Sequence, residues 1–107
     1  MITNSKNYCI ESLSGSLKRT ASWRRSLQNR YPDPRNERAA IRLDQLSHEV
    51  NELSDDSWLE LQKFYAWDSW IWSDAVSATS RQVEYRNVNT LPAFVNTLVG
   101  ILKSEQH

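Results

Sequence analysis

Apolar side chains recur every three or four residues along most of this 107-residue chain, which is the spacing of one face of an α-helix. Glycine is abundant in the turns of β-sandwiches and barrels, but it occurs here only at Gly15 and Gly100. Both observations favour helices over strands. A chain of this length supports one hydrophobic core of ordinary size, so we expect a single all-α domain.

Four helices are expected in a small helical domain, over residues 13–31, 34–53, 55–80 and 91–103. The last three follow residues that commonly cap a helix N-terminus: Asp33, Ser54 and Thr90. Pro34 and Pro92 fall in first helical turns, where a missing backbone N–H costs little. Residues 81–89 lose the helical spacing. Val83 and Tyr85 alternate with polar residues, as in a short extended segment, but we favour an ordered loop.

Residues 1–12 show no periodic spacing, so we expect a loosely ordered tail before a domain of residues 13–107. The tail lacks the apolar run of a secretory signal, and the longest apolar stretch, 91–102, is too short to cross a bilayer. Cys9 has no second cysteine with which to pair, as is usual in reducing compartments. We therefore expect a cytoplasmic protein without a membrane partner.

Residues 55–80 are unusual because six aromatic residues fall within fifteen positions: Trp58, Phe64, Tyr65, Trp67, Trp70 and Trp72. On a helical wheel most of them share one apolar face, but Leu59, Trp67 and Trp70 lie on a different face. A helix that is apolar on two faces is either enclosed within its domain or covered by a partner.

A partner-covered face is the basis for the function that we expect. Tryptophan is enriched at the energetic centres of protein interfaces, so Leu59, Trp67 and Trp70 are the candidate protein-interaction residues. The partner can be a second copy of the chain, because a two-fold axis pairs a surface with itself. The sequence thus predicts a small regulatory or accessory domain that binds a protein, with Trp67 or Trp70 exposed in the single chain.

Asp68 would lie in the middle of the main apolar face if residues 55–80 formed one straight helix. Two interpretations remain open. In the first, the carboxylate is partly desolvated and is held by an indole, an arginine or a backbone amide; such a group can also act as a general acid. In the second, the helix breaks and Asp68 caps a second short helix.

The charges are unevenly distributed although the net charge is zero. Residues 15–42 contain eight basic residues against two acidic ones, and residues 43–74 contain eight acidic residues against one lysine. Arginine is a preferred ligand for phosphate, so the alternative function is nucleic-acid binding. A solvated face, pairing between the two segments, or an acidic protein partner explains the same pattern. The candidate nucleic-acid-binding residues are Lys18, Arg19, Arg25, Arg30, Arg35, Arg38 and Arg42.

Catalytic, metal and cofactor sites have no clear pattern in the sequence, and we expect neither an enzyme nor a cofactor. The histidines are His48 and His107, far apart from each other and from Cys9, which does not match the spacing of a zinc site. His48 is off the apolar stripe and is expected to be solvated. Two glycines cannot supply a glycine-rich phosphate loop.

Overall fold

A computed structural model describes residues 2–66 and 68–105 of the chain, and it confirms the predicted all-α class. The described residues form five α-helices and one short 3₁₀ helix: α1 (Ile2–Arg30), α2 (Pro34–Glu49), η1 (Val50–Glu52), α3 (Asp55–Leu61), α4 (Trp70–Arg81) and α5 (Leu91–Ser104). No helix in the described part is both long enough and apolar enough to cross a membrane.

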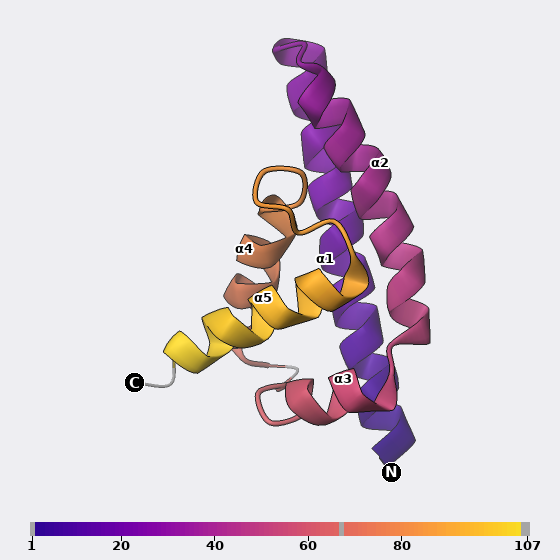
Figure 1. The fold of residues 1–107 in the computed structure, drawn as a ribbon, viewed down its shortest axis with the longest axis vertical. Helices are drawn as coiled ribbons and strands as arrows, with labels where there is room; N and C mark the ends of the chain where they lie inside the picture. Colours follow the sequence, from indigo (N-terminus) through magenta and orange to yellow (C-terminus); the bar gives the residue numbers. More distant parts are fainter. Residues whose placement is uncertain (1, 67, 106–107) are drawn as a thin grey trace.

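The helices α1 and α2 form an antiparallel pair along the long axis of the molecule (Figure 1). Asp33 caps α2 as predicted, because its side chain accepts a hydrogen bond from the Arg35 backbone N–H and Pro34 occupies the first turn. Buried leucines and alanines join the two helices in one core: Leu13, Leu17, Ala21, Ala39, Leu43 and Leu46.

The expectation of a loose tail over residues 1–12 is wrong, because α1 begins at Ile2. Cys9 is fully buried and continues the stripe of Leu13 and Leu17 at a spacing of four residues. Ser12 Oγ accepts a hydrogen bond of 2.9 Å from the indole N–H of Trp72. These contacts with distant residues stabilise helix in a segment whose own sequence is only weakly periodic.

The expected helix over residues 55–80 is interrupted in the structure. The helix α3 ends at Leu61, and α4 starts at Trp70. The break therefore exists, but Ser69 caps α4 by accepting a hydrogen bond from the Trp72 N–H at 3.3 Å, and Asp68 does not. Asp68 is exposed, so the interpretation as a partly desolvated carboxylate is also wrong.

Aromatic packing accounts for the break between α3 and α4. The ring of Tyr65 lies edge-on to Trp58, with centroids 6.3 Å apart, and edge-on to Trp72, with centroids 5.1 Å apart. Edge-to-face contacts of this kind add to the stabilisation from burial. The turn places Tyr65 against these rings while Asp68 reaches solvent, which a continuous helix would not allow.

The α4–α5 part of the molecule lies against one side of α1 (Figure 1). Its connection, residues 82–90, is the expected ordered loop, in which the Asn89 side-chain oxygen accepts a 2.9 Å hydrogen bond from the Glu84 N–H. Thr90 caps α5 as predicted, accepting from the Ala93 N–H at 3.2 Å. The apolar face of α5 completes the core with Phe94, Val95, Leu98, Val99 and Leu102.

Candidate functional site

Trp70, one of the expected interaction residues, is the first residue of α4 and is 70% exposed. It lines an open groove of about 520 Å³ between α4 and α5. We call this surface the Trp70 groove; its lining includes Trp70, Ile71, Asp74, Ala78, Arg81, Ile101 and Glu105. Apolar and charged side chains therefore meet in one concave surface.

Leu59, another residue of the predicted interaction face, does not join Trp70 in this groove. Leu59 is 53% exposed, but it lies on the separate helix α3. Trp67 lies outside the described residues. The neighbours of Trp70 are instead Ile71 and Ile101, and the latter comes from a helix that the wheel of residues 55–80 did not include.

The predicted basic cluster is divided by the structure into paired and unpaired residues. Arg25 forms an ion pair with Asp44 of α2, and Arg35 forms one with Asp33 at 2.8 Å. The Arg35 guanidinium also lowers the pKa of the Asp33 carboxyl, through its hydrogen bonds and its charge. These two pairs agree with the interpretation that part of the basic segment is neutralised within the chain.

Other members of the cluster have no ion pair within the described residues: Lys18, Arg19, Arg30, Arg38 and Arg42. Lys18, Arg30 and Arg38 are exposed. Arg42 is half-buried and lies in a different depression, together with Glu49 and Glu52. The structure therefore does not bring all seven predicted residues onto one surface.

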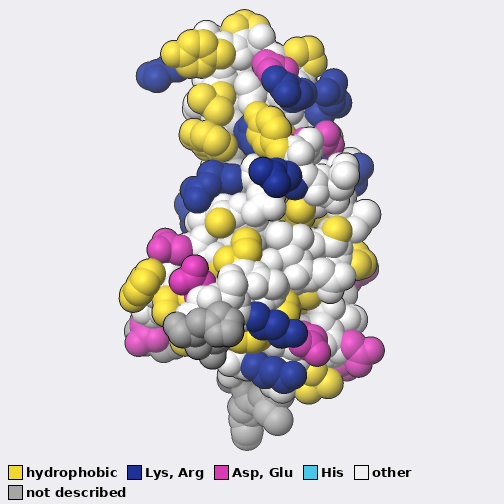
Figure 2. Space-filling view, turned by 60° about the vertical axis from the view of Figure 1, so that its left-hand side comes forward, with side chains coloured by type: hydrophobic (Ala, Val, Ile, Leu, Met, Phe, Trp, Pro, Cys, Tyr) yellow, Lys and Arg dark blue, Asp and Glu magenta, His cyan; other side chains and the backbone are white. Residues whose placement is uncertain are grey.

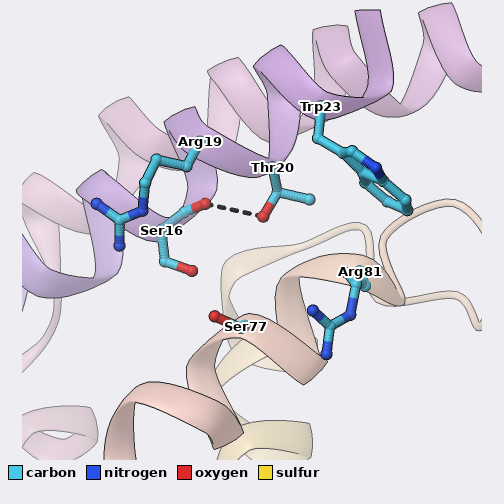
Figure 3. Close-up of a pocket in the computed structure, with 6 residues that line it drawn as sticks. All are labelled: Ser16, Arg19, Thr20, Trp23, Ser77 and Arg81. Carbon is cyan, nitrogen blue, oxygen red and sulfur yellow. Dashed lines mark hydrogen bonds between the residues drawn. The ribbon is translucent and has the colours of Figure 1, made fainter. Parts of the chain in front are cut away.

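Arg19 lines a second concave surface, a cleft of about 330 Å³ between α1 and α4 (Figure 3). We call it the Trp23 cleft; its lining is Ser16, Arg19, Thr20, Trp23, Ser77 and Arg81. The Thr20 hydroxyl donates a 2.9 Å hydrogen bond to the Ser16 carbonyl one turn earlier. Of these residues the sequence analysis predicted only Arg19 as a site residue, and Ser77 and Arg81 belong to α4, which only the fold places beside α1.

Arg24 contacts two lining residues of the Trp23 cleft, Trp23 and Arg81, and it was not among the predicted site residues. Its side chain is only 2% exposed and donates to the Asn36 side-chain oxygen, the Tyr85 hydroxyl and the Arg81 carbonyl. Arg81 is the last residue of α4, so the guanidinium lies at the negative end of the helix dipole. Within the described residues the buried guanidinium is thus held by neutral acceptors at its two terminal nitrogens, and its Nε has no hydrogen-bond partner there.

Two aromatic rings flank the Arg24 guanidinium. The guanidinium carbon lies 4.1 Å from the ring centroid of Tyr85 and 5.0 Å from that of Trp23. Both rings remain partly open to solvent, since Trp23 is 44% exposed and Tyr85 is 49% exposed. Cation–π contacts of this kind hold the rings in place while leaving part of each surface available.

The structure does not place Cys9 or His48 in a reactive or metal-binding site within the described residues. Burial raises the pKa of the Cys9 thiol to about 12, so this cysteine is protonated and unreactive at neutral pH. His48 is exposed on α2, as expected. Over residues 2–66 and 68–105, the structure shows no group of three or more potential metal-ligating side chains.

Comparisons with known proteins do not assign a function to either surface. No family model, no curated protein and no solved structure matches this chain. The functional argument therefore rests on the geometry of the Trp70 groove and the Trp23 cleft.

Proposed function

We propose that this protein acts by binding protein rather than by catalysis, and that it self-associates through the Trp70 groove. The observation that supports this proposal is the 70% exposure of Trp70 beside apolar side chains of α4 and α5. A tryptophan side chain buries roughly 150–250 Å² when it is enclosed, at about 25 cal/mol per Å². Covering the exposed part of Trp70 would thus contribute about 3 kcal/mol to association.

The charges of the Trp70 groove favour a second copy of the chain as the partner. Arg81 lies seven residues beyond Asp74 on α4, which corresponds to about 10 Å along the helix axis. A two-fold axis across the groove would bring Arg81 of one protomer opposite the partner's Asp74. Opposite charges arranged in this way fix the orientation of a self-complementary interface.

A stable homodimer buries about 800 Å² on each partner, so the contact must extend beyond the groove itself. Trp70 would then be the central anchor, and the charged residues would surround it. Anchors of this kind contribute most of the binding energy, while charges at the rim mainly affect orientation and rate. Substituting the anchor is therefore the most sensitive test.

The experiment measures the molar mass by size-exclusion chromatography with light scattering over a range of protein concentrations. We expect the wild-type chain to form a dimer and Trp70→Ala to be monomeric, with an unchanged circular dichroism spectrum. Tyr31→Ala is the matched control, because Tyr31 is also an aromatic residue with 70% exposure but lies at the turn between α1 and α2. This control is expected to remain a dimer.

Charge reversal tests the orientation of the proposed interface. Arg81→Glu should weaken the dimer, and adding Asp74→Arg should restore it, because the pair would then be reversed in both protomers. A wild-type chain that remains monomeric at about 0.1 mM would contradict self-association and leave a different protein as the partner. If Trp70→Ala unfolds the chain, its ring belongs to the core and the proposal is wrong.

A further inference from the structure

The Trp23 cleft shares Ser77 and Arg81 with the Trp70 groove, but its other lining residues belong to α1 and give it a chemical character of its own. Its polar lining consists of hydroxyl groups and two guanidiniums, and none of its described lining residues is acidic. Hydroxyls and guanidiniums can all donate hydrogen bonds. The lining is therefore suited to an anion, and the indole of Trp23 adds a flat surface at one end.

Arg19 and Arg81 are available to such an anion. Within the described residues, neither side chain forms an ion pair, in contrast to Arg25 with Asp44. Ser77 makes no hydrogen bond to the other lining residues (Figure 3). The guanidiniums of Arg19 and Arg81 and the Ser77 hydroxyl thus border the same cleft, and no carboxylate of the described residues pairs with either arginine.

Gly15 provides the space in which the Arg19 side chain lies. A Cβ atom added at Gly15 would be 3.2 Å from Arg19 Nη1, which is closer than an ordinary contact. A glycine in the middle of a helix costs roughly 0.5–1 kcal/mol relative to alanine. In α1, Gly15 leaves room for the Arg19 guanidinium to lie back along the helix, at the edge of the cleft.

Trp23 is held as a platform at the other end of the cleft from Arg19 (Figure 3). It lies one turn beyond Arg19, about 6 Å along the helix axis. Arg24 contacts its ring from the buried side, and 44% of the side chain remains exposed. An exposed ring fixed beside free arginines is the arrangement that proteins use to stack a base next to its phosphate.

We propose that the Trp23 cleft binds a nucleotide unit. In this arrangement Arg19 and Arg81 bind the phosphate, and the base stacks on Trp23. The cleft of about 330 Å³ falls within the size range of small-ligand sites. A free nucleotide and one link of a single-stranded nucleic acid present the same chemistry. An acidic peptide would supply negative charge for the arginines but has no base to stack on Trp23. The bases of a duplex are already stacked on one another, so they are not available to the ring.

Neighbouring side chains extend the basic and aromatic surface beyond the cleft. Figure 2 shows Lys and Arg side chains interleaved with hydrophobic ones over the upper half of this face. Arg30 continues the edge of α1 that carries Arg19 and Trp23, about 10 Å beyond the tryptophan. Exposed Tyr85 and Arg86 follow in the loop after α4. A track of this length favours a single strand as the source of the nucleotide.

The binding experiment uses fluorescence anisotropy with a labelled ten-nucleotide dT strand and the same length of U. We expect binding at 50 mM salt that weakens as salt increases, with a log–log slope of about 0.7 for each phosphate contact. Arg19→Ala should lower the affinity and reduce this slope by about 0.7. Lys18→Ala is the matched control, because Lys18 is the adjacent exposed cation but does not line the cleft.

Stacking is tested with Trp23→Leu and Trp23→Phe. Removing the ring should weaken binding by roughly tenfold or more, and phenylalanine should retain most of the affinity. Thermal unfolding of each variant shows whether the chain is still folded as the wild type is. Unlabelled dTMP distinguishes the two sources: competition comparable to that of the ten-nucleotide strand would support a free nucleotide, and weak competition would support a single strand.

Several outcomes would overturn the nucleotide proposal. They are the absence of binding to both strands and to dTMP at low salt, tighter binding to a duplex than to a single strand, equal binding to polyglutamate, and equal losses from Lys18→Ala and Arg19→Ala. The proposal does not rest on self-association: Arg81 lines both surfaces, but Arg19 and Trp23 line the cleft alone. Trp70→Ala should bind the strands as the wild type does, so the two proposals can fail separately.

Discussion

The helix α1 presents two different surfaces to its neighbours, and their comparison explains where the molecule is stable and where it is open. Towards α2 it contributes Leu17 and Ala21, which are completely buried. Towards α4 it contributes Ser16, Thr20 and the stem of Arg19. The first contact is a continuous apolar seam, whereas the second is a narrow polar contact with a cleft beside it.

Hydroxyl side chains account for the close but incomplete contact on the α4 side. The Ser16 and Ser80 hydroxyl oxygens lie 3.3 Å apart, and the Ser80 and Thr79 hydroxyls also donate to carbonyls one turn earlier in α4. Small side chains that satisfy their own hydrogen bonds allow two helices to approach without filling all the space between them. The unfilled space is the Trp23 cleft.

The arginines of α1 show the same difference between the two sides. Arg25 pairs with Asp44 on the α2 side and Arg24 is buried, whereas Arg19, at the edge of the α4 side, has no ion pair in the part of the chain that the structure describes. All three have the same chemistry and lie within seven residues of one helix. The neighbouring element therefore decides whether an arginine stabilises the fold, lies on the surface or is free to bind.

Substitutions in the apolar seam between α1 and α2 should lower the free energy of unfolding most. Leu17→Ala removes a fully buried side chain from the core and should lower the free energy of unfolding by about 2–5 kcal/mol. Urea denaturation monitored by circular dichroism measures the change. The exposed neighbour provides the control, and Lys18→Ala should have an effect within about 0.5 kcal/mol. A small loss for Leu17→Ala would mean that the seam is not the main source of stability.

The next largest effect is expected at the buried arginine. Arg24→Met keeps the apolar stem but leaves the Asn36 and Tyr85 side chains and the Arg81 carbonyl without their donor, which should cost about 1–3 kcal/mol. Arg24→Lys should recover little, because a compact ammonium cannot reach all three acceptors. Chemical denaturation tests both variants. Wild-type stability in Arg24→Met would show that the guanidinium does not hold α4 to α1.

Replacing either glycine by alanine should stabilise the fold, and the two gains should differ. Gly100 lies in α5 with no atom within 4 Å of an added Cβ, so Gly100→Ala should raise the unfolding free energy by about 0.5–1 kcal/mol. Gly15→Ala should gain less, because the Arg19 guanidinium must move. Thermal denaturation of both variants gives the difference. Equal gains would indicate that Gly15 does not constrain the position of Arg19.

The smallest effect is expected for the ion pair on the α2 side. Arg25 and Asp44 are both about half exposed, so their coupling should be about 0.2–0.5 kcal/mol. A double-mutant cycle with Arg25→Ala and Asp44→Ala measures this coupling, which should decrease in high salt. If the Arg25–Asp44 coupling energy exceeded the unfolding free energy lost in Arg24→Met, Arg25 would contribute more to stability than Arg24, contrary to our expectation.

Local chemistry made several features of the fold predictable from the sequence. Asp33, Ser54 and Thr90 each cap the helix that follows them, because a cap is formed by a side chain and a backbone N–H only two or three residues apart. The class, the ordered loop before Thr90 and the exposure of His48 follow from equally short-range patterns. The exposure of Trp70 agrees with the expectation that Trp67 or Trp70 would be exposed, which came from their position outside the main apolar face of residues 55–80.

Only the tertiary structure decided which residues form the two candidate surfaces. Arg24 and Arg25 are indistinguishable in the sequence, but the acceptors of Arg24 on Arg81 and Tyr85 lie 57 and 61 residues away. The helical start of α1 and the break before Trp70 likewise depend on Trp72 meeting Ser12 and Tyr65. Caps and periodicity act over a few residues, whereas burial, pairing and clefts depend on which elements meet, because those contacts join residues that are distant in the chain.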